Sequence, residues 1–494
     1  MREYLAKRKR IFSILAPTVF GILYMLICMT CLRRSVWTGE SYSAYLTHFG
    51  FREIFDFSAA GTQPPLYYVF LKIWAHIFGR SDFDLRFMSV FFGAIAIMFA
   101  YMWMKYKYGA KSATLGALLL SLSPLLIRCG QEMQPFTMAT AIVLASTYFL
   151  QLALDNEKQK WWITYAVLAA AGLWTSYYTA FAFLAQLIYL CFVYGKRVLQ
   201  KRVFLTFGLA CLLFAAWLPK LIAQLPQFGA NPVSLHRLAD FCGQAFLLRD
   251  ADSITGGLLL LLITGLSLVA LFAAKYRHGL RFLLCGTLAP VLALIIFSVT
   301  PFALELAPEK ILFSVVCATM LGGVSIVILA NNLRLHSTHR QRANWAFAGS
   351  AVILLLLSAS GIGASFEPAD YDFDKLHQNL ATVNAVEQLP IVTDDPWLYY
   401  NLSFYDTSQV FFLAEDASYD SGLLRPLEKS YFGKISKLDA YLEKHHLSDF
   451  WLVKEAPAHG DIASPIPGFA SAQVLTLQFR DHGQSFEAVH FAKE

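Results

Sequence analysis

The chain has 494 residues, of which 57% are hydrophobic and only 15% are charged, and its mean hydropathy is +0.49. This composition excludes a water-soluble protein built around a single core, and it predicts repeated apolar helices that cross a membrane. The formal net charge of +6 comes largely from short basic loops between the apolar runs. Contact with anionic lipid explains this charge, so we expect no nucleic-acid partner.

About eleven apolar runs are long enough for transmembrane helices, since a helix needs about 20 residues to cross the hydrocarbon layer. The predicted spans are 11–31, 88–104, 113–128, 136–154, 161–177, 179–195, 203–222, 255–274, 280–299, 311–330 and 344–363. With the N-terminus in the cytoplasm, every second loop is rich in Lys and Arg, as cytoplasmic loops are. This pattern predicts a multi-pass protein of the cytoplasmic (inner) membrane. The stretch 64–79 is short and carries Lys72 and His76, so we interpret it as an interfacial helix.

The composition changes near residue 364, where mixed polar and apolar segments replace the apolar runs. A helix-like segment, DKLHQNLATVNAVEQ (374–388), is followed by strand-like segments, and this alternation indicates a small α/β domain. The predicted fold is therefore an all-α polytopic membrane domain of residues 1–363 and a soluble, extracytoplasmic α/β domain of residues 364–494. The second domain shows no phosphate-binding loop and no nucleophile elbow, so we assign no chemistry to it.

The first long outer segment, 32–87, contains a lone carboxylate just after the first span, in VWTGESYSAYL (36–46). Two short amphipathic helices are predicted in this segment, before a turn at Pro64-Pro65. Glu40 has two interpretations. It is either a catalytic carboxylate or only a helix cap, because an acidic residue in the first turn interacts favourably with the helix dipole.

The second candidate segment is IRCGQEMQPF (127–136), at the end of the third predicted span. It contains Arg128, Gln131, Glu132 and Gln134. A charge in this position can be a solvated group at the membrane boundary. It can also be functional, because Glu40 and Glu132 near one membrane face would form an acid–base or donor-orienting pair.

Two further outer segments are polar. LWTSYYTAF (173–181) contains Tyr177, and ALELAPEKILF (303–313) places Glu309 and Lys310 at the start of a helix. A cation in that position opposes the helix dipole. Lys310 is therefore either a binding group for an anionic headgroup or an interfacial lysine whose side chain reaches water.

The chain resembles the lipid-linked-sugar glycosyltransferases of the GT-C fold, over most of residues 10–330. The segments that carry the resemblance are VWTGESYS, TQPPLYYVFLKIWAHIFGRSDFDLRFMS, YGAKSATLGALLLSLSPLLIRCGQEMQPF, SYYTAFAFLAQ and AAWLPKLI. They are similar to the family 39 type, which is related to protein O-mannosyltransferases and to aminoarabinose transferases of lipid A. The resemblance implies a GT-C membrane domain, a polyprenyl-phosphate sugar donor and inversion of the anomeric centre.

The same resemblance implies the roles of individual residues. Glu40 would belong to an Asp-Glu pair whose aspartate is the expected base, but Gly39 replaces that aspartate here. Glu40 would then take over as the base, with Glu132 as the second catalytic carboxylate. The predicted substrate-binding residues are Gln63, Tyr67, Asp82, Arg86, Arg128, Gln131, Gln134, Tyr177 and Lys310.

Several positions depart from the family pattern in one direction. Gln63 stands where the family commonly has His or Lys, Gln134 where it has Arg, and Ser176 where it has His. Groups that would carry a proton or bind phosphate are thus neutral in this chain. Loss of a general base costs about 10²–10⁴-fold in rate, which permits a slow enzyme.

Two functions are compatible with these features. One is transfer of a sugar from a polyprenyl-phosphate donor to a glycan, lipid or protein acceptor at the outer face of the cytoplasmic membrane. The other is a catalytically degenerate relative that binds a lipid-linked glycan or serves as an assembly subunit, for which the lost charges are not needed. A transporter is less well supported, because the notable charges lie at one face and not at mid-membrane. No cofactor is predicted; a divalent cation held by Glu132 is the alternative.

Overall fold

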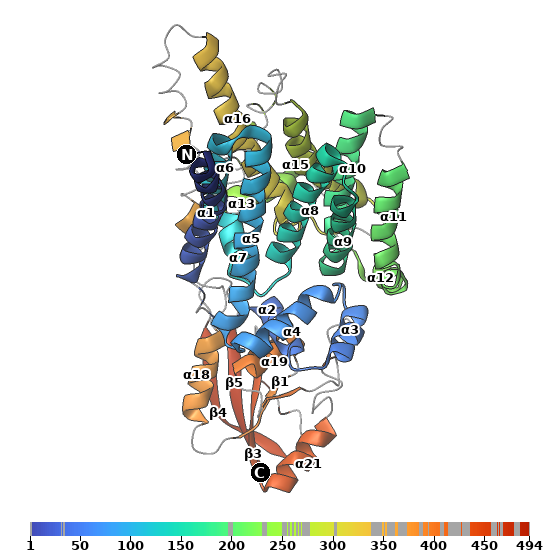
Figure 1. Cartoon of the computed structure of the whole chain (residues 1–494). Coiled ribbons are helices and arrows are strands. Elements are labelled where there is room, and N and C mark those ends of the chain that lie inside the picture. Colours follow the sequence, from blue (N-terminus) through green and yellow to red (C-terminus); the bar gives the residue numbers. More distant parts are fainter. Residues whose placement is uncertain are drawn as a thin grey trace. The chain divides into compact units, whose positions relative to one another are not determined.

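The computed structural model divides the chain into two compact units (Figure 1). The first unit comprises Met1–Leu32 and Arg86–Glu367, and the second comprises Arg33–Leu85 and Pro368–Glu494. The structure describes residues 2–30, 35–195, 201–229, 235–248, 277–300 and 304–336, isolated residues between these ranges, and segments of 373–493 separated by short gaps. The predicted domain boundaries, 1–363 and 364–494, stay a prediction.

The first unit is helical. Its helices are α1 (Arg2–Met29), α5 (Asp82–Tyr108) from Arg86 onwards, α6 (Ala110–Ser121), α7 (Pro124–Gly130), α8 (Phe136–Asn156), α9 (Gln159–Thr175), α10 (Thr179–Tyr194), α11 (Lys201–Ala215), α12 (Leu218–Gln224), the 3₁₀-helix η2 (Leu225–Gln227), α13 (Leu235–Leu247), α15 (Arg277–Phe297) and α16 (Leu312–His336). Among neighbours in space, α6 packs on α16, α8 on α9, α9 on α11, and α10 and α16 on α15.

Four helices among the described residues are long and apolar enough to cross a membrane. They are Asp82–Tyr108, Phe136–Asn156, His278–Phe297 and Leu312–Asn332. Two bent pairs of helices raise the number to six if each pair is one span. The predicted spans 255–274 and 344–363 lie largely outside the described residues, so the expected count of about eleven stays a prediction.

Proline explains both bends. The axis turns by 58° between α6 and α7 and by 69° between α11 and α12. In each pair the second helix has a proline in its first turn, Pro124 or Pro219. Proline has no backbone N–H and so cannot continue the hydrogen bonding of the preceding helix, whereas it fits the first turn of a new one. After the first bend, α7 ends at Gly130, directly before Gln131 and Glu132.

Among the four long apolar helices of the described residues, α16 is the most deeply buried. Of its most apolar window, 94% is buried, as expected for a helix that is hydrophobic on all sides. A Cβ atom at Gly323 would lie 3.0 Å from the Cα atom of Gly116 in α6. The two helices therefore approach closely because both positions are glycine, which is typical of helix packing in membranes.

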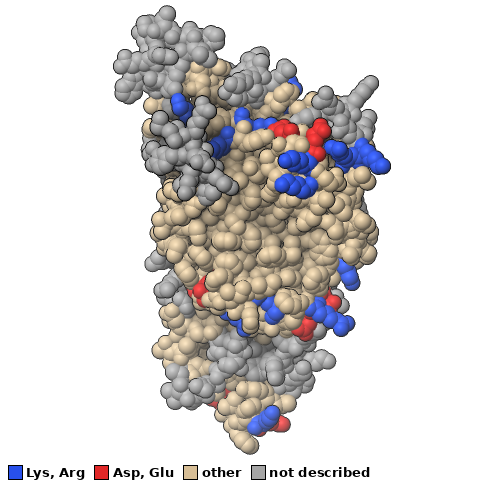
Figure 2. Space-filling view, viewed as in Figure 1, with Lys and Arg blue, Asp and Glu red and all other residues tan. Residues whose placement is uncertain are grey.

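The surface of the first unit carries a wide belt without charge. Figure 2 shows this belt in tan, with Lys, Arg, Asp and Glu along its upper border. Large apolar side chains on the surface include Phe192, which is 75% exposed, and Leu212, which is 70% exposed. An uncharged belt next to a charged border is typical of a protein embedded in a bilayer.

The second unit combines helices with one sheet. Its elements are α2 (Thr38–Leu46), α3 (Phe51–Ala60), α4 (Leu66–Phe78), α18 (Phe373–Val383), β1 (Ile391–Thr393), α19 (Pro396–Tyr405), β2 (Val410–Phe412), α21 (Ile435–His445), β3 (Asp449–Glu455), β4 (Phe469–Gln478) and β5 (Ser485–Lys493). The strand order is β2-β1-β3-β5-β4. β1 runs parallel to β2 and β3, whereas β5 is antiparallel to β3 and β4.

The sheet is covered on both faces. Trp451 and Val453 of β3 pack in one cluster with residues of α18 and α19. Phe450 and Leu452, which alternate with them, pack in another cluster with residues of α21. Because successive side chains of a strand point to opposite faces, this alternation places one helical layer on each side of the sheet.

The first outer segment forms helices that belong to this second unit. α4 has 13 residues, fewer than the about 20 that a span needs, and it falls within the stretch 64–79. α2 packs against α19 through tyrosines: Tyr42 lies 5.3 Å from Tyr400, and Tyr45 lies 5.1 Å from Tyr400, measured between ring centroids. Segments far apart in the sequence therefore share one core.

Candidate functional site

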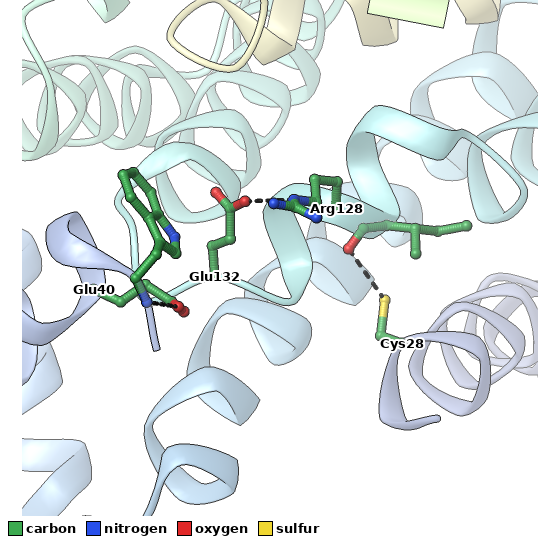
Figure 3. A network of polar contacts seen from close by, with 6 residues as sticks. Cys28, Glu40, Arg128 and Glu132 are labelled. Atoms are coloured by element: carbon green, nitrogen blue, oxygen red, sulfur yellow. Dashed lines mark hydrogen bonds and ion pairs between the residues drawn. The ribbon is translucent and has the colours of Figure 1, made fainter. Parts of the chain in front are cut away.

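The clearest polar contact among the predicted site residues lies at the end of α7. Arg128 Nε donates a hydrogen bond of 2.8 Å to Glu132 Oε1 (Figure 3). The side chain of Glu132 is only 9% exposed and that of Arg128 is 29% exposed. Burying a charge is costly unless it is paired, and Arg128 supplies a partner for this carboxyl group.

Helix α1 fixes the position of α7. Tyr24 Oη donates to the carbonyl oxygen of Leu126 at 2.8 Å, and Cys28 Sγ contacts that of Ile127 at 3.8 Å (Figure 3). The Ile127 carbonyl oxygen also accepts the backbone N–H of Gln131 at 3.1 Å, so α1 adds side-chain contacts to carbonyl groups near the end of α7. Gln131 is fully buried, and its Nε2 atom lies 3.4 Å from the carbonyl oxygen of Cys28.

A second carboxylate lies within electrostatic range of Glu132. It belongs to Glu309, in the segment before α16. Burial raises the pKa of Glu309 above its ordinary value, and the negative charge of Glu132 raises it further, whereas the Glu309 backbone N–H and Lys310 lower it. The Lys310 ammonium forms an ion pair with Glu305 and lies 5.8 Å from the ring centroid of Tyr178.

Tyr177 is held by two hydrogen bonds in the turn between α9 and α10. Its hydroxyl donates to Gln224 Oε1 at 2.5 Å and accepts from Trp217 Nε1 at 2.7 Å. The tyrosine thus ties this turn to the bend between α11 and α12. Gln134, also predicted to bind substrate, is half-buried, and its backbone N–H donates to the carbonyl oxygen of Glu132 at 2.9 Å.

Glu40 lies in the second unit, in the first turn of α2. It is fully buried, and its Oε2 atom is 3.4 Å from the backbone nitrogen of Trp37 (Figure 3). This hydrogen bond satisfies one of the backbone N–H groups at the start of the helix, as in a capping box. Glu40 thus makes the contact of a helix cap, and its catalytic interpretation stays a prediction.

The remaining predicted residues have contacts of their own. Gln63 is half-buried in the turn before α4, and Tyr67 is buried with its ring centroid 5.6 Å from that of Tyr68. Asp82 begins α5, where its Oδ1 atom accepts the backbone N–H of Phe83 at 2.8 Å. Arg86 is fully buried.

Arg86 donates from Nη1 to the carbonyl oxygen of Leu32 at 2.7 Å, a contact inside the first unit. A buried guanidinium on a backbone carbonyl stabilises the segment that it contacts. Arg86 therefore has a structural role that the sequence did not indicate.

The structure brings the predicted residues together in two groups. Arg128, Glu132 and Lys310 lie in the first unit, where Glu309 joins them electrostatically. Glu40 belongs to the second unit, so the predicted pairing of Glu40 with Glu132 stays a prediction.

Three residues contribute to the site in ways that the sequence did not predict. Glu309 is a charge at a helix start, but its proximity to Glu132 had no signal in the sequence. Gln224 and Trp217 were missed because their role is to hold Tyr177, and residues so distant in sequence share no spacing pattern. Within the part of the chain that the structure describes, no three His, Cys, Asp or Glu side chains are grouped so as to hold a metal ion.

Comparisons with known proteins agree with this architecture. A family model described as dolichyl-phosphate-mannose-protein mannosyltransferase matches residues 62–222. This range includes Arg128, Glu132 and Tyr177 but neither Glu40 nor Lys310. No curated protein matches the chain.

Solved structures share the fold at low sequence identity. ArnT from Cupriavidus metallidurans in the apo state superposes with a TM-score of 0.62 at 13% identity, covering 97% of this chain and 98% of that chain. The same protein bound to undecaprenyl phosphate gives 0.60 at 14% identity, with the same coverage. The Archaeoglobus fulgidus oligosaccharyltransferase in the apo form gives 0.53 at 13% identity, covering 89% of this chain and 69% of that chain. The resemblance to GT-C proteins of the protein-mannosyltransferase type is thus confirmed.

Proposed function

We propose that this chain transfers a sugar from a polyprenyl-phosphate donor to a glycan, lipid or protein acceptor at the outer face of the cytoplasmic membrane. The observation that carries the proposal is the buried Arg128–Glu132 pair with Glu309 and Lys310 nearby, in a chain with the fold of ArnT. That structure was also obtained with undecaprenyl phosphate bound. Charged groups of both signs beside apolar helices suit a ligand with a phosphate head and a lipid tail.

The proposed reaction breaks the bond between the anomeric carbon of the sugar and the phosphate oxygen. A bond forms between the anomeric carbon and the acceptor oxygen, and the hydroxyl proton passes to a carboxylate. The leaving polyprenyl phosphate keeps the electron pair and gains negative charge. Cationic groups placed where this charge develops lower the barrier, which is the role proposed for Lys310 and Arg128.

The carboxylates divide between two roles in this proposal. Glu40 would be the base, as the residue beside the position of the missing aspartate. Glu132 would orient the acceptor, since its charge is already balanced by Arg128 at 2.8 Å. Glu309, whose pKa burial raises, is suited to hold a proton at a pH where an exposed glutamate is ionised.

The test is donor turnover by the purified protein in lipid nanodiscs. A mixed panel of polyprenyl-phosphate sugars is added, and mass spectrometry measures the released polyprenyl phosphate. Glu40→Gln should lower release by about 10²-fold or more if Glu40 is the base. Arg128→Gln should also lower release.

A matched control for Glu40 exists in the same unit. Glu53 occupies the same position of α3, where its Oε2 atom accepts the backbone N–H of Gly50 at 2.8 Å. Glu53→Gln should therefore leave release unchanged. Equal effects of Glu40→Gln and Glu53→Gln would show that Glu40 only caps its helix.

One observation favours a second function. The Glu40 carboxylate is buried against the start of its own helix, and Gly39 offers no replacement acid. The chain would then bind a lipid-linked glycan without transferring the sugar. Donor binding without release from any member of the panel, with release restored in Gly39→Asp, would establish this alternative.

A further inference from the structure

A groove between α9 and α11 lies outside the residues assigned to the proposed transfer site. Its volume is about 450 Å³, within the range of about 300–1,000 Å³ typical of small-molecule sites. The walls are formed mainly by Trp162, Ile163, Phe204, Leu205 and Leu212. All of these except Trp162 are exposed, so the groove opens onto the apolar surface of the first unit.

The charged group of the groove and its one amide side chain lie at one end, and Thr206 lies one turn further along α11. Gln159 is the first residue of α9 and Arg202 the second residue of α11. The two helix starts are neighbours, because Arg202 Nη1 lies 3.3 Å from the carbonyl oxygen of Glu157. The positive ends of two helix dipoles therefore add to the charge of the guanidinium.

The charges around this end are mostly positive. Lys158, Lys160, Lys201 and Arg202 outnumber the single acid of the same two segments, Glu157. Arg202 and Glu157 form an ion pair of 3.8 Å, and their side chains are 54% and 80% exposed. An exposed pair of this kind is weak, so the guanidinium can exchange Glu157 for another anion.

The length of the groove matches one leaflet. Arg202 and Leu212 are ten residues apart on α11, so the helix rises by about 15 Å between them. This distance is about half of the ~30 Å hydrocarbon layer. An amphiphile with its anionic head at Arg202 and one acyl chain reaching Leu212 would fill the groove.

Gly208 lines the middle of the groove and is exposed. A Cβ atom at this position would meet no heavy atom within 4 Å. Alanine therefore fits here without displacing a neighbour, whereas a large side chain would fill the groove.

We propose that this groove binds one anionic glycerophospholipid of the leaflet that borders residues 157–160 and 201–202. The phosphate binds Arg202, and an acyl chain lies along Phe204, Gly208 and Leu212. Basic pockets between membrane helices bind anionic headgroups by this chemistry. The proposal does not depend on sugar transfer.

Native mass spectrometry of the delipidated full chain in detergent tests the proposal. Dioleoyl-phosphatidylglycerol and dioleoyl-phosphatidylcholine are titrated separately. The wild type should retain one phosphatidylglycerol molecule more tightly than any phosphatidylcholine. Gly208→Trp, which fills the groove, should remove this binding event, and Arg202→Gln should weaken it about five-fold while binding of phosphatidylcholine stays unchanged.

Two controls separate the site from general effects. Gly208→Ala adds a Cβ atom into open space, and Lys201→Gln removes an exposed charge next to Arg202 that does not line the groove. Gly208→Ala should bind phosphatidylglycerol like the wild type, and Lys201→Gln should weaken this binding less than Arg202→Gln does. The proposal fails if Gly208→Trp retains the bound lipid, or if Arg202→Gln and Lys201→Gln behave alike. The proposal also fails if an equal concentration of undecaprenyl phosphate displaces the bound phosphatidylglycerol, because the groove would then be a site for a polyprenyl lipid.

Discussion

The ion pair between Arg128 and Glu132 gives the most quantitative prediction. Arg128→Ala removes a hydrogen bond of 2.8 Å and leaves a carboxylate with a side chain only 9% exposed. A hydrogen bond to a charged group is worth about 1.5–3 kcal/mol. Because Arg128 is itself 29% exposed, we expect the lower part of this range, a loss of about 2 kcal/mol in the free energy of unfolding.

Glu132→Gln should cost less than Arg128→Ala. The amide oxygen still accepts from Arg128 Nε, but the charge is lost, so we expect about 1 kcal/mol. The double variant, Arg128→Ala with Glu132→Gln, should be about 1 kcal/mol more stable than the sum of the two single losses predicts. This coupling energy is expected because the double variant has no unpaired charge of the former ion pair.

Equilibrium unfolding in mixed micelles measures this cycle. The exposed pair Arg202–Glu157, with 3.8 Å between Nη1 and Oε2, is the control and should show a coupling below about 0.5 kcal/mol. A coupling energy within about 0.3 kcal/mol of zero for Arg128 and Glu132 would refute the argument, since that is the error of additivity for independent sites.

Three further predictions concern stability. Burial holds the pKa of Glu309 above its ordinary value of 4.5, so the folded chain binds this proton more tightly than the unfolded chain does. The resulting stability is present below pH 4.5 and is lost as the pH rises through the raised pKa. Glu309→Gln should abolish this dependence of the free energy of unfolding on pH, measured by urea titrations at several pH values. Tyr45→Leu removes edge-to-face contacts with α19 and should cost about 1–3 kcal/mol, seen as faster hydrogen exchange in α19 but unchanged exchange in α16. Gly130→Ala places a Cβ atom against Tyr24 Oη and should lower stability by about 1–3 kcal/mol, whereas Tyr24→Phe in the same chain should recover part of this loss in a thermal unfolding assay.

Local features were predictable because their causes are local. Apolar runs of sufficient length predicted α5, α8 and α16, and the pattern around Glu40 predicted a helix start with an acid in its first turn. The proline at 124 explains a break between two helices, but its presence in the sequence does not give the angle of 58° between them. Periodicity reports which residues are buried and not the angle between two helices.

Long-range contacts had no signal in one sequence. The packing of Tyr42 and Tyr45 on Tyr400 joins segments at opposite ends of the chain, and a tyrosine at a membrane exit has the same pattern whether it faces lipid or another helix. The proximity of Glu309 to Glu132 is hidden for the same reason. The sequence indicated charged residues at the ends of helices, and only the fold shows which of them interact.

The two cations proposed to bind phosphate differ in how readily they can do so. Arg128 is paired with a buried carboxylate, and separating such a pair leaves an uncompensated charge away from water, which is costly. Lys310 is paired with Glu305, whose side chain is 64% exposed, so that water can replace the lysine at little cost. A donor phosphate would therefore exchange with Glu305 for Lys310 more readily than with Glu132 for Arg128. In the proposed reaction Lys310 would therefore be the main group on the leaving phosphate, and Arg128 would contribute less there because it also holds Glu132 in place.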